Sequence, residues 1–373
     1  MASNLAGYLA SVIVMTTQAE QAELFASLHK PGDPLLLANA WDVGSAVAIA
    51  TAGAKAIATT SAGVAWSLGV PDAGEAAGTA GQGAGQGAGQ GAGLDAGLDA
   101  VAVASVISRI AAAVPLPLSA DIEAGYGDSP DAVAATVAAV VAAGAVGVNL
   151  EDRRDATSLY EPAEQADRLA AARAAAPVGI WINARTDVFL SGAYPDPAAA
   201  IAAALQRAAV YQQAGADSLF VPGLVDLEAI AELTKGPLPV AVMVWPGAPN
   251  VAELTAAGVV RISLGSAIAQ AAYGLAARAA AEMFTAGTYD SSGGGFDYGA
   301  MNAALQRASG GVLPVVTDEV AEAGHPVDQA FVLQQLHGSA RRPSGCRLLT
   351  AQHRDRRHPA SGRQLSRLDP AAQ

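Results

Sequence analysis

Eight short apolar segments recur between residues 35 and 265, and helix-like runs separate most of them. The segments are Leu35–Trp41, Ala56–Ser61, Leu116–Ile122, Val146–Glu151, Ile180–Arg185, Ser218–Pro222, Val240–Trp245 and Arg261–Gly265. Each is continuously apolar rather than alternating, which is typical of parallel strands covered by helices on both faces. This repeat of strand and helix restricts the chain to an α/β architecture.

The runs between the strands are rich in alanine and have helical spacing. The clearest are Asp131–Ala143, Pro162–Ala175, Pro197–Ala214 and Asp226–Leu233. Gly144 and Gly215 follow two of these runs, as expected for a glycine C-cap before the next strand. Eight such units over about 250 residues predict a (β/α)8 TIM barrel. An open doubly wound sheet is the alternative, but no G-x-G-x-x-G follows the first strand to support it.

Three stretches fall outside this repeat. Residues 1–17 form an N-terminal extension, expected to be untranslated or disordered, because Met15 is a second candidate start. A Gly/Ala/Gln-rich insertion at about 76–100 repeats GAGQ without a periodic apolar face, so we expect a flexible segment within a barrel domain spanning 18–323. Residues 324–373 are rich in Arg, His, Gln and Pro, which predicts a basic disordered tail.

The net charge of −13 is unevenly distributed. From residue 338 onward the tail carries eight Arg against two Asp, so the barrel itself is strongly acidic and is not expected to bind nucleic acid. No Lys or Arg precedes Lys30, and the apolar stretch 5–15 is too short to span a bilayer. The single cysteine, Cys346, excludes an intrachain disulfide. We therefore expect a cytoplasmic protein without a membrane partner.

Acidic residues follow two neighbouring strands of the predicted barrel. Asp121 and Glu123 are two residues apart, so on an extended strand both side chains point to the same side. Glu151 ends the next strand. Like charges on a buried strand repel each other and lose hydration unless a cation lies between them. Because Mg²⁺ prefers one or two carboxylates plus waters and substrate oxygens, these acids predict a Mg²⁺ site. A pair of solvated surface acids is the alternative.

Other strand ends supply candidate substrate contacts. Arg185 ends the fifth strand, where it can neutralise charge that develops on substrate oxygens. The backbone N–H groups of Ala62 and Gly63, in a turn without bulky side chains, can hold a carboxylate. Trp41 ends the first strand and either packs on the substrate or fills the barrel mouth. His29 precedes the barrel, and we expect it at the surface.

Several motifs occur together in one known group of enzymes. ANAWDVGSA, TTSAGVAWSLGVPD, SADIEAGYGD, VNLEDR and INARTDVFL resemble the isocitrate lyase/phosphoenolpyruvate mutase superfamily, and in particular a phosphoenolpyruvate phosphonomutase-like branch of unassigned substrate. The resemblance covers about residues 31–280. It implies a (β/α)8 barrel that binds Mg²⁺, or Mn²⁺ in its place, and passes through a pyruvate-enolate-like species. It also implies a homo-oligomer, a dimer or tetramer, whose subunits exchange the eighth helix.

The resemblance also implies a role for each matching residue. Asp121 would bind the metal directly. Ser61 and the turn after it would bind the substrate carboxylate, and Arg185 would stabilise the enolate oxygen. The acids that would hold metal-bound waters are Asp72, Glu123 and Glu151.

The chain departs from the superfamily in the parts that select the substrate and donate protons. The lyases carry a K-K-C-G-H-type loop with a catalytic cysteine after the fourth strand. Residues 153–160 contain no cysteine, and the lysine and asparagine of the phosphonomutases are also missing. Strands six and seven end in Val221–Gly223 and Val244–Pro246, without a polar residue for a second substrate carboxylate. Isocitrate and methylisocitrate cleavage are therefore not expected. Tyr160 is the candidate proton donor, brought in by loop closure.

The expected function is that of a Mg²⁺-dependent enzyme acting on a small 2-oxo or enol carboxylate. Cleavage of a carbon–carbon bond, as in a lyase or decarboxylase, is favoured, and oxaloacetate is the first substrate to test because it is small. One alternative is a carbon–phosphorus mutase or hydrolase of the phosphoenolpyruvate mutase type. Another is a catalytically inactive barrel that binds a metabolite, which would explain the missing proton donor.

Overall fold

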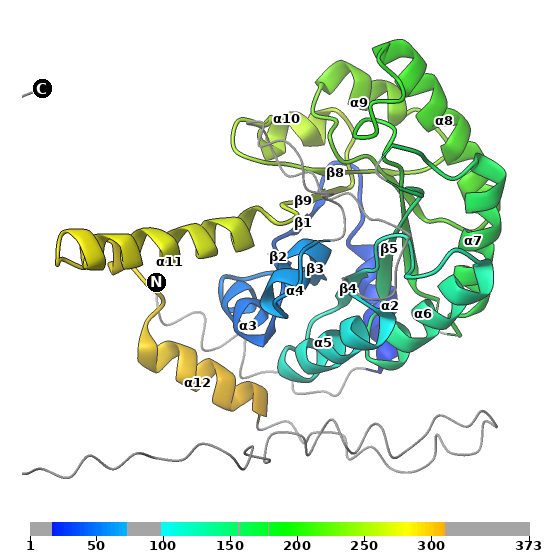
Figure 1. Cartoon of the computed structure of the whole chain (residues 1–373). Helices are drawn as coiled ribbons and strands as arrows, with labels where there is room; N and C mark the ends of the chain where they lie inside the picture. The colour runs from blue at the N-terminus through cyan, green and yellow to red at the C-terminus, as the bar shows by residue number, and fades with distance from the viewer. Residues whose placement is uncertain (1–16, 73–97, 156, 178, 310–373) are drawn as a thin grey trace, which may run out of the picture. The chain divides into compact units, whose positions relative to one another are not determined.

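A computed structural model describes residues 17–72, 98–155, 157–177 and 179–309 of the chain. All but the last residue of the predicted N-terminal extension, nearly all of the Gly/Ala/Gln-rich insertion and the whole predicted basic tail lie outside the described residues. The described part contains a single parallel sheet surrounded by helices (Figure 1).

The sheet closes into the predicted barrel. Its strands are β1 Leu35–Leu37, β2 Asn39–Ala40, β3 Ile57–Thr59, β4 Leu118–Asp121, β5 Gly147–Glu151, β6 Trp181–Arg185, β7 Ser218–Phe220, β8 Val240–Met243 and β9 Arg261–Ser263. Only residue 38 separates β1 from β2, so these two form one interrupted strand. Its first half pairs with β9 and its second half with β3, which closes the circle. All eight predicted strands are confirmed, and the open sheet is excluded.

Helices alternate with the strands as predicted. They are α2 Gln18–Ser27, α3 Val43–Thr51, α4 Ser61–Ser67, α5 Ala100–Ala113, α6 Pro130–Ala142, α7 Pro162–Ala174, α8 Pro197–Gln213, α9 Leu227–Leu233, α10 Val251–Ala256, α11 Ala267–Thr285 and α12 Tyr298–Ser309. Helices α6, α7 and α8 each begin with proline, whose fixed φ suits the first helical position. Gly144 and Gly215 adopt φ of 108° and 95°, which confirms the predicted glycine ends.

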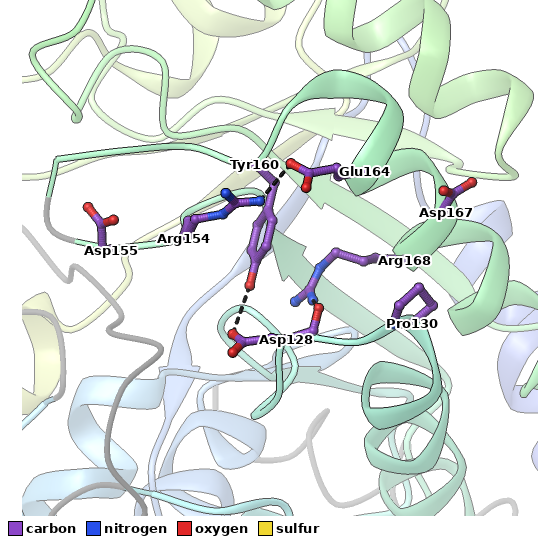
Figure 2. A pocket seen from close by; sticks show the side chains of 8 residues that line it. All are labelled: Asp128, Pro130, Arg154, Asp155, Tyr160, Glu164, Asp167 and Arg168. Carbon is purple, nitrogen blue, oxygen red and sulfur yellow. Dashed lines mark hydrogen bonds and ion pairs between the residues drawn. The ribbon is translucent and has the colours of Figure 1, made fainter.

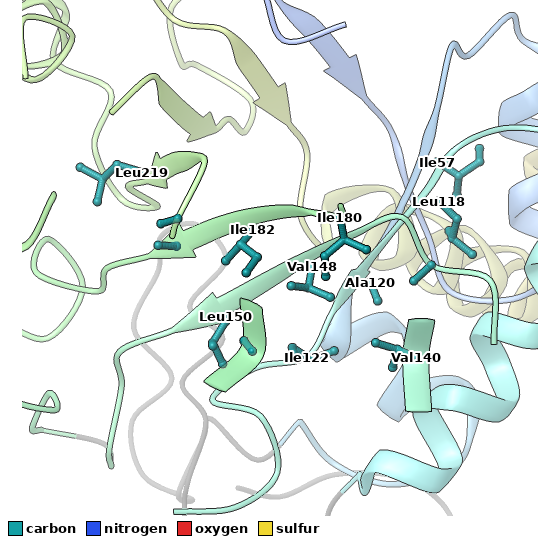
Figure 3. Close-up of a cluster of buried hydrophobic side chains, with 14 of the residues drawn as sticks. Ile57, Leu118, Ala120, Ile122, Val140, Val148, Leu150, Ile180, Ile182 and Leu219 are labelled. Atoms are coloured by element: carbon teal, nitrogen blue, oxygen red, sulfur yellow. The ribbon is translucent and has the colours of Figure 1, made fainter. Parts of the chain in front are cut away.

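The two faces of the barrel strands have different chemistry. Outward side chains such as Val148 and Leu150 pack beneath the helices in one large apolar cluster (Figure 3). The alternate residue Asn149 instead accepts hydrogen bonds from Asn183 at 2.8 Å and Arg261 at 3.0 Å. Asn183 comes from the neighbouring strand β6, whereas Arg261 comes from β9, so the second bond crosses the barrel interior. The outer layer supplies hydrophobic stabilisation, and the polar interior leads toward the strand ends.

Helix α2 packs against the beginnings of the strands. Phe25 is fully buried there, and a Cβ on Gly147 would lie only 2.7 Å from its ring. His29, just after α2, is also buried and stacks on Trp181 with ring centroids 4.0 Å apart. The expectation that His29 lies at the surface is therefore wrong. The aromatic ring of Trp181 and the short α2 segment enclose it.

The last two helices differ from the others in burial. Of α11, only Ala269 is buried, and Figure 1 shows this helix leading away from the strands. Helix α12 packs against α3 and α5, with Ala304 buried in the contact. No helix among the described residues combines the length and apolar character that a membrane span requires.

Candidate active site

The last residues of three adjacent strands form the centre of the candidate site. Asp121, Glu151 and Arg185 end β4, β5 and β6. Glu151 lies opposite Arg185 in the parallel register, and Asp121 lies opposite Asn149, two residues before Glu151. Because parallel strands end at one edge, the fold brings two carboxylates and a guanidinium together there.

Asp121 is held by the neighbouring strand β3 and by the start of α4. Its backbone N–H donates to Thr59 Oγ1 at 2.9 Å, and the Ser61 N–H donates to its Oδ2 at 3.2 Å. The other oxygen, Oδ1, is buried and has no hydrogen-bond partner among the described residues. Glu151 Oε1 is likewise buried and has no hydrogen-bond partner among the described residues. Buried polar atoms are almost always paired, so both oxygens have the capacity to bind a ligand.

Glu123 adds a third carboxylate to this edge. It follows β4 in the left-handed backbone region, with φ of 48°, and accepts a hydrogen bond from the Tyr126 hydroxyl at 3.2 Å. Burial, followed by the charges of Asp72 and Asp121, raises the pKa of Glu123 to about 8. Asp72, Asp121 and Glu123, which come from two separate segments, therefore repel one another at close quarters, and a bound cation would relieve this repulsion.

Arg185 lies within a buried network of ion pairs. Its Nη1 is 2.7 Å from Glu151 Oε2, and its Nε and Nη2 donate to the two oxygens of Asp187 at 2.7 and 2.8 Å. Although burial lowers it, these carboxylates raise the pKa of Arg185 well above its ordinary value. Burial also raises the pKa of Glu151, and the ion pair with Arg185 opposes that shift. Arg185 is thus a fixed and permanently charged group.

The donor set suits a cation that keeps most of its waters. Among the described residues, no three Asp, Glu, His or Cys side chains converge as direct metal ligands. Mg²⁺ typically binds one or two carboxylates and retains several waters, so a site of this kind does not need such a cluster. The two unpartnered oxygens of Asp121 and Glu151, and the crowding around Glu123, therefore fit Mg²⁺.

The turn predicted to hold a carboxylate is the first turn of α4. Ser61, Ala62 and Gly63 are all buried there. A Cβ on Gly63 would lie 2.8 Å from Thr60 Cγ2 and 2.9 Å from Trp41 Cβ, so only glycine fits. Helix starts leave backbone N–H groups without intrahelical partners, which preserves the predicted anion-binding capacity in a different conformation. Trp41 is half-buried beside this turn.

Tyr160 is not brought to the acids. Its hydroxyl donates to Asp128 Oδ1 at 3.2 Å, and its ring lies 4.6 Å from Arg154 and 4.1 Å from Arg168 (Figure 2). It contributes to a cavity of about 590 Å³ between the loops after β4 and β5. The cavity is lined by Asp128, Pro130, Arg154, Asp155, Tyr160, Glu164, Asp167 and Arg168. Asp128 thus engages the Tyr160 hydroxyl in this structure, and the role of Tyr160 as a proton donor stays a prediction that depends on loop closure.

Arg168 was not identified from the sequence. It is buried on α7 and donates hydrogen bonds to backbone carbonyls of the loop after β4. Its sequence signal is weak, since an arginine in an alanine-rich helix usually faces water. One feature sets Arg168 apart from an ordinary surface arginine. It lies three residues after Gln165, a second polar residue on the same helix face.

Comparison with known proteins identifies the family. The family model of phosphoenolpyruvate phosphomutase matches residues 25–81 and 75–284. An uncharacterised protein of Mycobacterium tuberculosis is 38% identical over 259 residues, which cover 69% of this chain and 87% of the relative. A crystal structure from Burkholderia cenocepacia, provisionally called a phosphonomutase, is 39% identical with a TM-score of 0.62. It covers 73% of this chain and 100% of that protein.

More distant relatives have assigned activities. The 2-methylisocitrate lyase of Salmonella typhimurium is 32% identical over 223 residues, covering 54% of this chain and 65% of the lyase. An oxaloacetate decarboxylase of Rhodopseudomonas palustris is 33% identical over 142 residues, covering 36% and 48% of the two chains. Phosphonopyruvate hydrolase in complex with oxalate and Mg²⁺ shares the fold, with 22% identity, a TM-score of 0.61, and coverage of 77% and 95%. The chain belongs to the phosphoenolpyruvate phosphomutase family, within the isocitrate lyase/phosphoenolpyruvate mutase superfamily of lyases and mutases.

Proposed function

We propose that the chain is a Mg²⁺-dependent enzyme that cleaves a carbon–carbon bond in a small 2-oxo carboxylate, with oxaloacetate as the first candidate. The observation that carries the proposal is the pair of buried, unpartnered oxygens on Asp121 and Glu151, beside the fixed cation Arg185. Cleavage next to a carbonyl leaves negative charge on oxygen, and a site of fixed positive groups stabilises that charge.

Asp121 would hold the metal directly, and its backbone bonds keep the carboxylate in place. The acids that would hold metal-bound waters are Asp72, Glu123 and Glu151. When bound, Mg²⁺, or Mn²⁺ in its place, supplies Lewis-acid polarisation of the substrate carbonyl. A phosphonopyruvate hydrolase of the same fold has been crystallised with oxalate and Mg²⁺, which supports this choice of metal and of ligand class.

Two further groups would act on the substrate itself. Arg185 would stabilise the enolate oxygen, because its bonds to Asp187 and Glu151 fix its orientation before substrate arrives. Ser61 and the N–H groups of Ala62 and Gly63, at the start of α4, would receive the substrate carboxylate, and Trp41 would border it. The Ser61 N–H itself binds Asp121, so metal and carboxylate would share one short segment.

Carbon–carbon cleavage is favoured over carbon–phosphorus chemistry by the distribution of positive charge. A phosphonate needs cations that are not already neutralised. Arg153 and Arg185, which lie just after β5 and at the end of β6, are both paired with Asp187, and Arg207 on α8 is paired with Asp152. Relatives that act on carbon–carbon bonds, the methylisocitrate lyase and the oxaloacetate decarboxylase, are consistent with this preference.

The experiment combines product release with proton exchange. Full-length protein is incubated with Mg²⁺ and oxaloacetate, and pyruvate release is followed. In parallel, NMR follows uptake of solvent deuterium into the methyl group of pyruvate. We expect both activities in the wild type and a loss of about 100-fold or more in Asp121→Ala, since metal-ion catalysis supplies several kcal/mol. Asp131→Ala, at an exposed acid of α6, is the matched control and should retain full activity.

Other outcomes separate the alternatives. Pyruvate release from phosphonopyruvate but not from oxaloacetate would establish the carbon–phosphorus chemistry instead. Mg²⁺-dependent binding of oxalate without deuterium exchange would identify an inactive metabolite-binding barrel. Absence of Mg²⁺ binding would refute the proposal as a whole.

We also infer that the chain forms a homo-oligomer, a dimer or tetramer, in which α11 is exchanged between subunits. The support is that α11 is almost entirely unburied, with Ala269 as its one buried residue. The large apolar residues that α11 leaves exposed are Tyr273, Leu275, Met283 and Phe284. Exposed apolar side chains gathered on one element mark an interaction surface.

A further inference from the structure

The turn between β4 and α6 carries Glu123 in an unfavourable backbone conformation. Glu123 and Tyr126 have φ of 48° and 52°, and they are the only non-glycine residues with positive φ among the described residues. L-residues with side chains rarely occupy this region, and such strain persists only where the surroundings hold the chain in place. Contacts from neighbouring elements must therefore hold this turn in its conformation.

Side chains from two helices bind the backbone carbonyls of the turn. Arg168 on α7 donates from Nη1 to the carbonyls of Gly127, at 3.0 Å, and Asp128, at 2.6 Å, and from Nη2 to the carbonyl of Ala124. Thr136 Oγ1 on α6 donates to the Gly125 carbonyl at 2.8 Å. The planar, multidentate guanidinium fixes three points of the turn at once, which a single-point donor does not achieve.

The same stretch of α7 also contacts the strand end that carries Glu151. Arg168 Nε donates to Gln165 Oε1 at 3.1 Å, and Gln165 Nε2 donates to the Glu151 carbonyl at 3.1 Å. Arg168 is 1% exposed and Gln165 is fully buried, so water does not compete for these bonds. One pair of side chains thus connects the backbone segments of two candidate metal-site acids.

We propose that Arg168 is a positioning residue that sets the places of the Glu123 and Glu151 carboxylates at the Mg²⁺ site. The inference rests on the proposed function, because it assigns Arg168 a role in metal binding. Residues that orient metal ligands without binding the metal themselves typically change the metal affinity about 10- to 100-fold. Arg168 acts through the turn and does not itself touch the metal or the substrate.

Arg173 provides a matched control on the same helix. Its side chain donates to the backbone carbonyls of Ile180, at 2.6 Å, and Gly215, at 2.7 and 3.0 Å. These carbonyls precede β6 and β7, at the opposite end of the barrel from the acids. Loss of Arg173 therefore removes the same kind of arginine–carbonyl bonds, together with an ion pair to Asp217, without affecting the turn that carries Glu123.

The test measures Mn²⁺ affinity of the full-length protein by electron paramagnetic resonance, which does not depend on activity. We expect Arg168→Met to weaken Mn²⁺ binding about 10- to 100-fold. Arg168→Lys should restore part of the affinity, because a lysine keeps the charge and one donor direction. Arg173→Met should bind Mn²⁺ like the wild type. Thermal melts of each variant report the loss of stability, which we expect to be larger for Arg168→Met, because Arg168 is buried and Arg173 is partly exposed.

Thr136→Val gives a milder test if Arg168→Met does not fold. It removes only the bond to the Gly125 carbonyl, and a several-fold weaker Mn²⁺ affinity would support the inference. Wild-type affinity in Arg168→Met, or in Thr136→Val where the first variant is unfolded, would overturn the role of Arg168 and leave the proposed function intact. Failure of the wild type to bind Mn²⁺ would overturn both.

Discussion

At the scale of single residues, His29 shows how burial changes chemistry. Its Nδ1 lies 2.9 Å from the Phe25 carbonyl, which only accepts, so Nδ1 carries the proton. The Nε2 atom is buried without a partner among the described residues. Burial, and then the nearby charge of Arg261, lower the pKa of His29 from 6.5 to about 3, and the bond to Phe25 opposes this only in part. The native state therefore excludes the charged imidazole.

This environment predicts a loss of stability in acid. Between pH 6.5 and about 3 the unfolded chain binds a proton at His29 and the native state does not, so the free energy of unfolding falls as pH falls. At pH 5 the contribution is about 2 kcal/mol, since each pKa unit is about 1.4 kcal/mol. Urea unfolding of wild type and His29→Phe at pH 7.5 and 5.0 measures it. The variant should lose about 2 kcal/mol less between the two values, and an equal loss would contradict the prediction.

The acids and Arg168 show why some residues can be found from sequence and others cannot. Asp121 and Glu151 end apolar segments, so the strand pattern alone predicts that they meet at one edge. Arg168 acts on carbonyls about 40 residues away along the chain, and backbone carbonyls carry no sequence signal. His29 was placed wrongly for the same reason, because the Trp181 ring that covers it comes from a distant strand.

At the scale of elements, the junction of β3 and α4 depends on one glycine. Gly63 lies in the first turn of α4, where a Cβ would meet Thr60 and Trp41 at 2.8 and 2.9 Å. The neighbouring strand holds Thr60, so neither contact can relax freely. The same turn carries the Ser61 N–H that binds Asp121. Packing at this junction is therefore linked to the geometry of the candidate site.

Gly63→Ala should accordingly destabilise the protein by about 1–3 kcal/mol, the usual cost of overpacking a filled site. Gly44→Ala is the control in α3, where the nearest atom to a new Cβ is 3.5 Å away. Because alanine is the better helix former, that variant should be neutral or up to about 1 kcal/mol more stable. Urea unfolding of both variants at one pH gives the comparison. Equal stability of the two would show that the junction has room for a methyl group.

Elements were predictable where one physical pattern dominated. The strands covered on both faces are continuously apolar, so each was located to within a few residues. Helices α6, α7 and α8 are themselves alanine-rich runs, and each begins at a proline. Helix α4 was interpreted as a bare turn because seven residues containing a glycine show no helical period. The break between β1 and β2 likewise has no sequence signal, since it arises from pairing with two different strands.

At the scale of the whole molecule, α11 is a helix that packs almost none of its surface into the core of the described chain. Each of the helices α3 to α10 buries at least one apolar residue, whereas the 19-residue α11 buries only Ala269. Phe284, near its end, is 81% exposed and Met283 is 60% exposed. Removing such side chains from water contributes about 1.5–3 kcal/mol each, so a second copy of the chain that covers them would be strongly favoured.

Exchange of α11 predicts that assembly depends on these two side chains. We expect multi-angle light scattering to find a dimer or tetramer for the wild type. The double variant Met283→Glu, Phe284→Glu should shift toward the monomer, because each glutamate would bury a charge in the apolar contact. Val101→Glu, at an exposed position of α5, should leave the mass unchanged. Circular dichroism checks that the barrel persists in the monomer, since α11 adds little to its core. A monomeric wild type, or a double variant of unchanged mass, would rule out the exchange, and the exposed face of α11 would then need another partner.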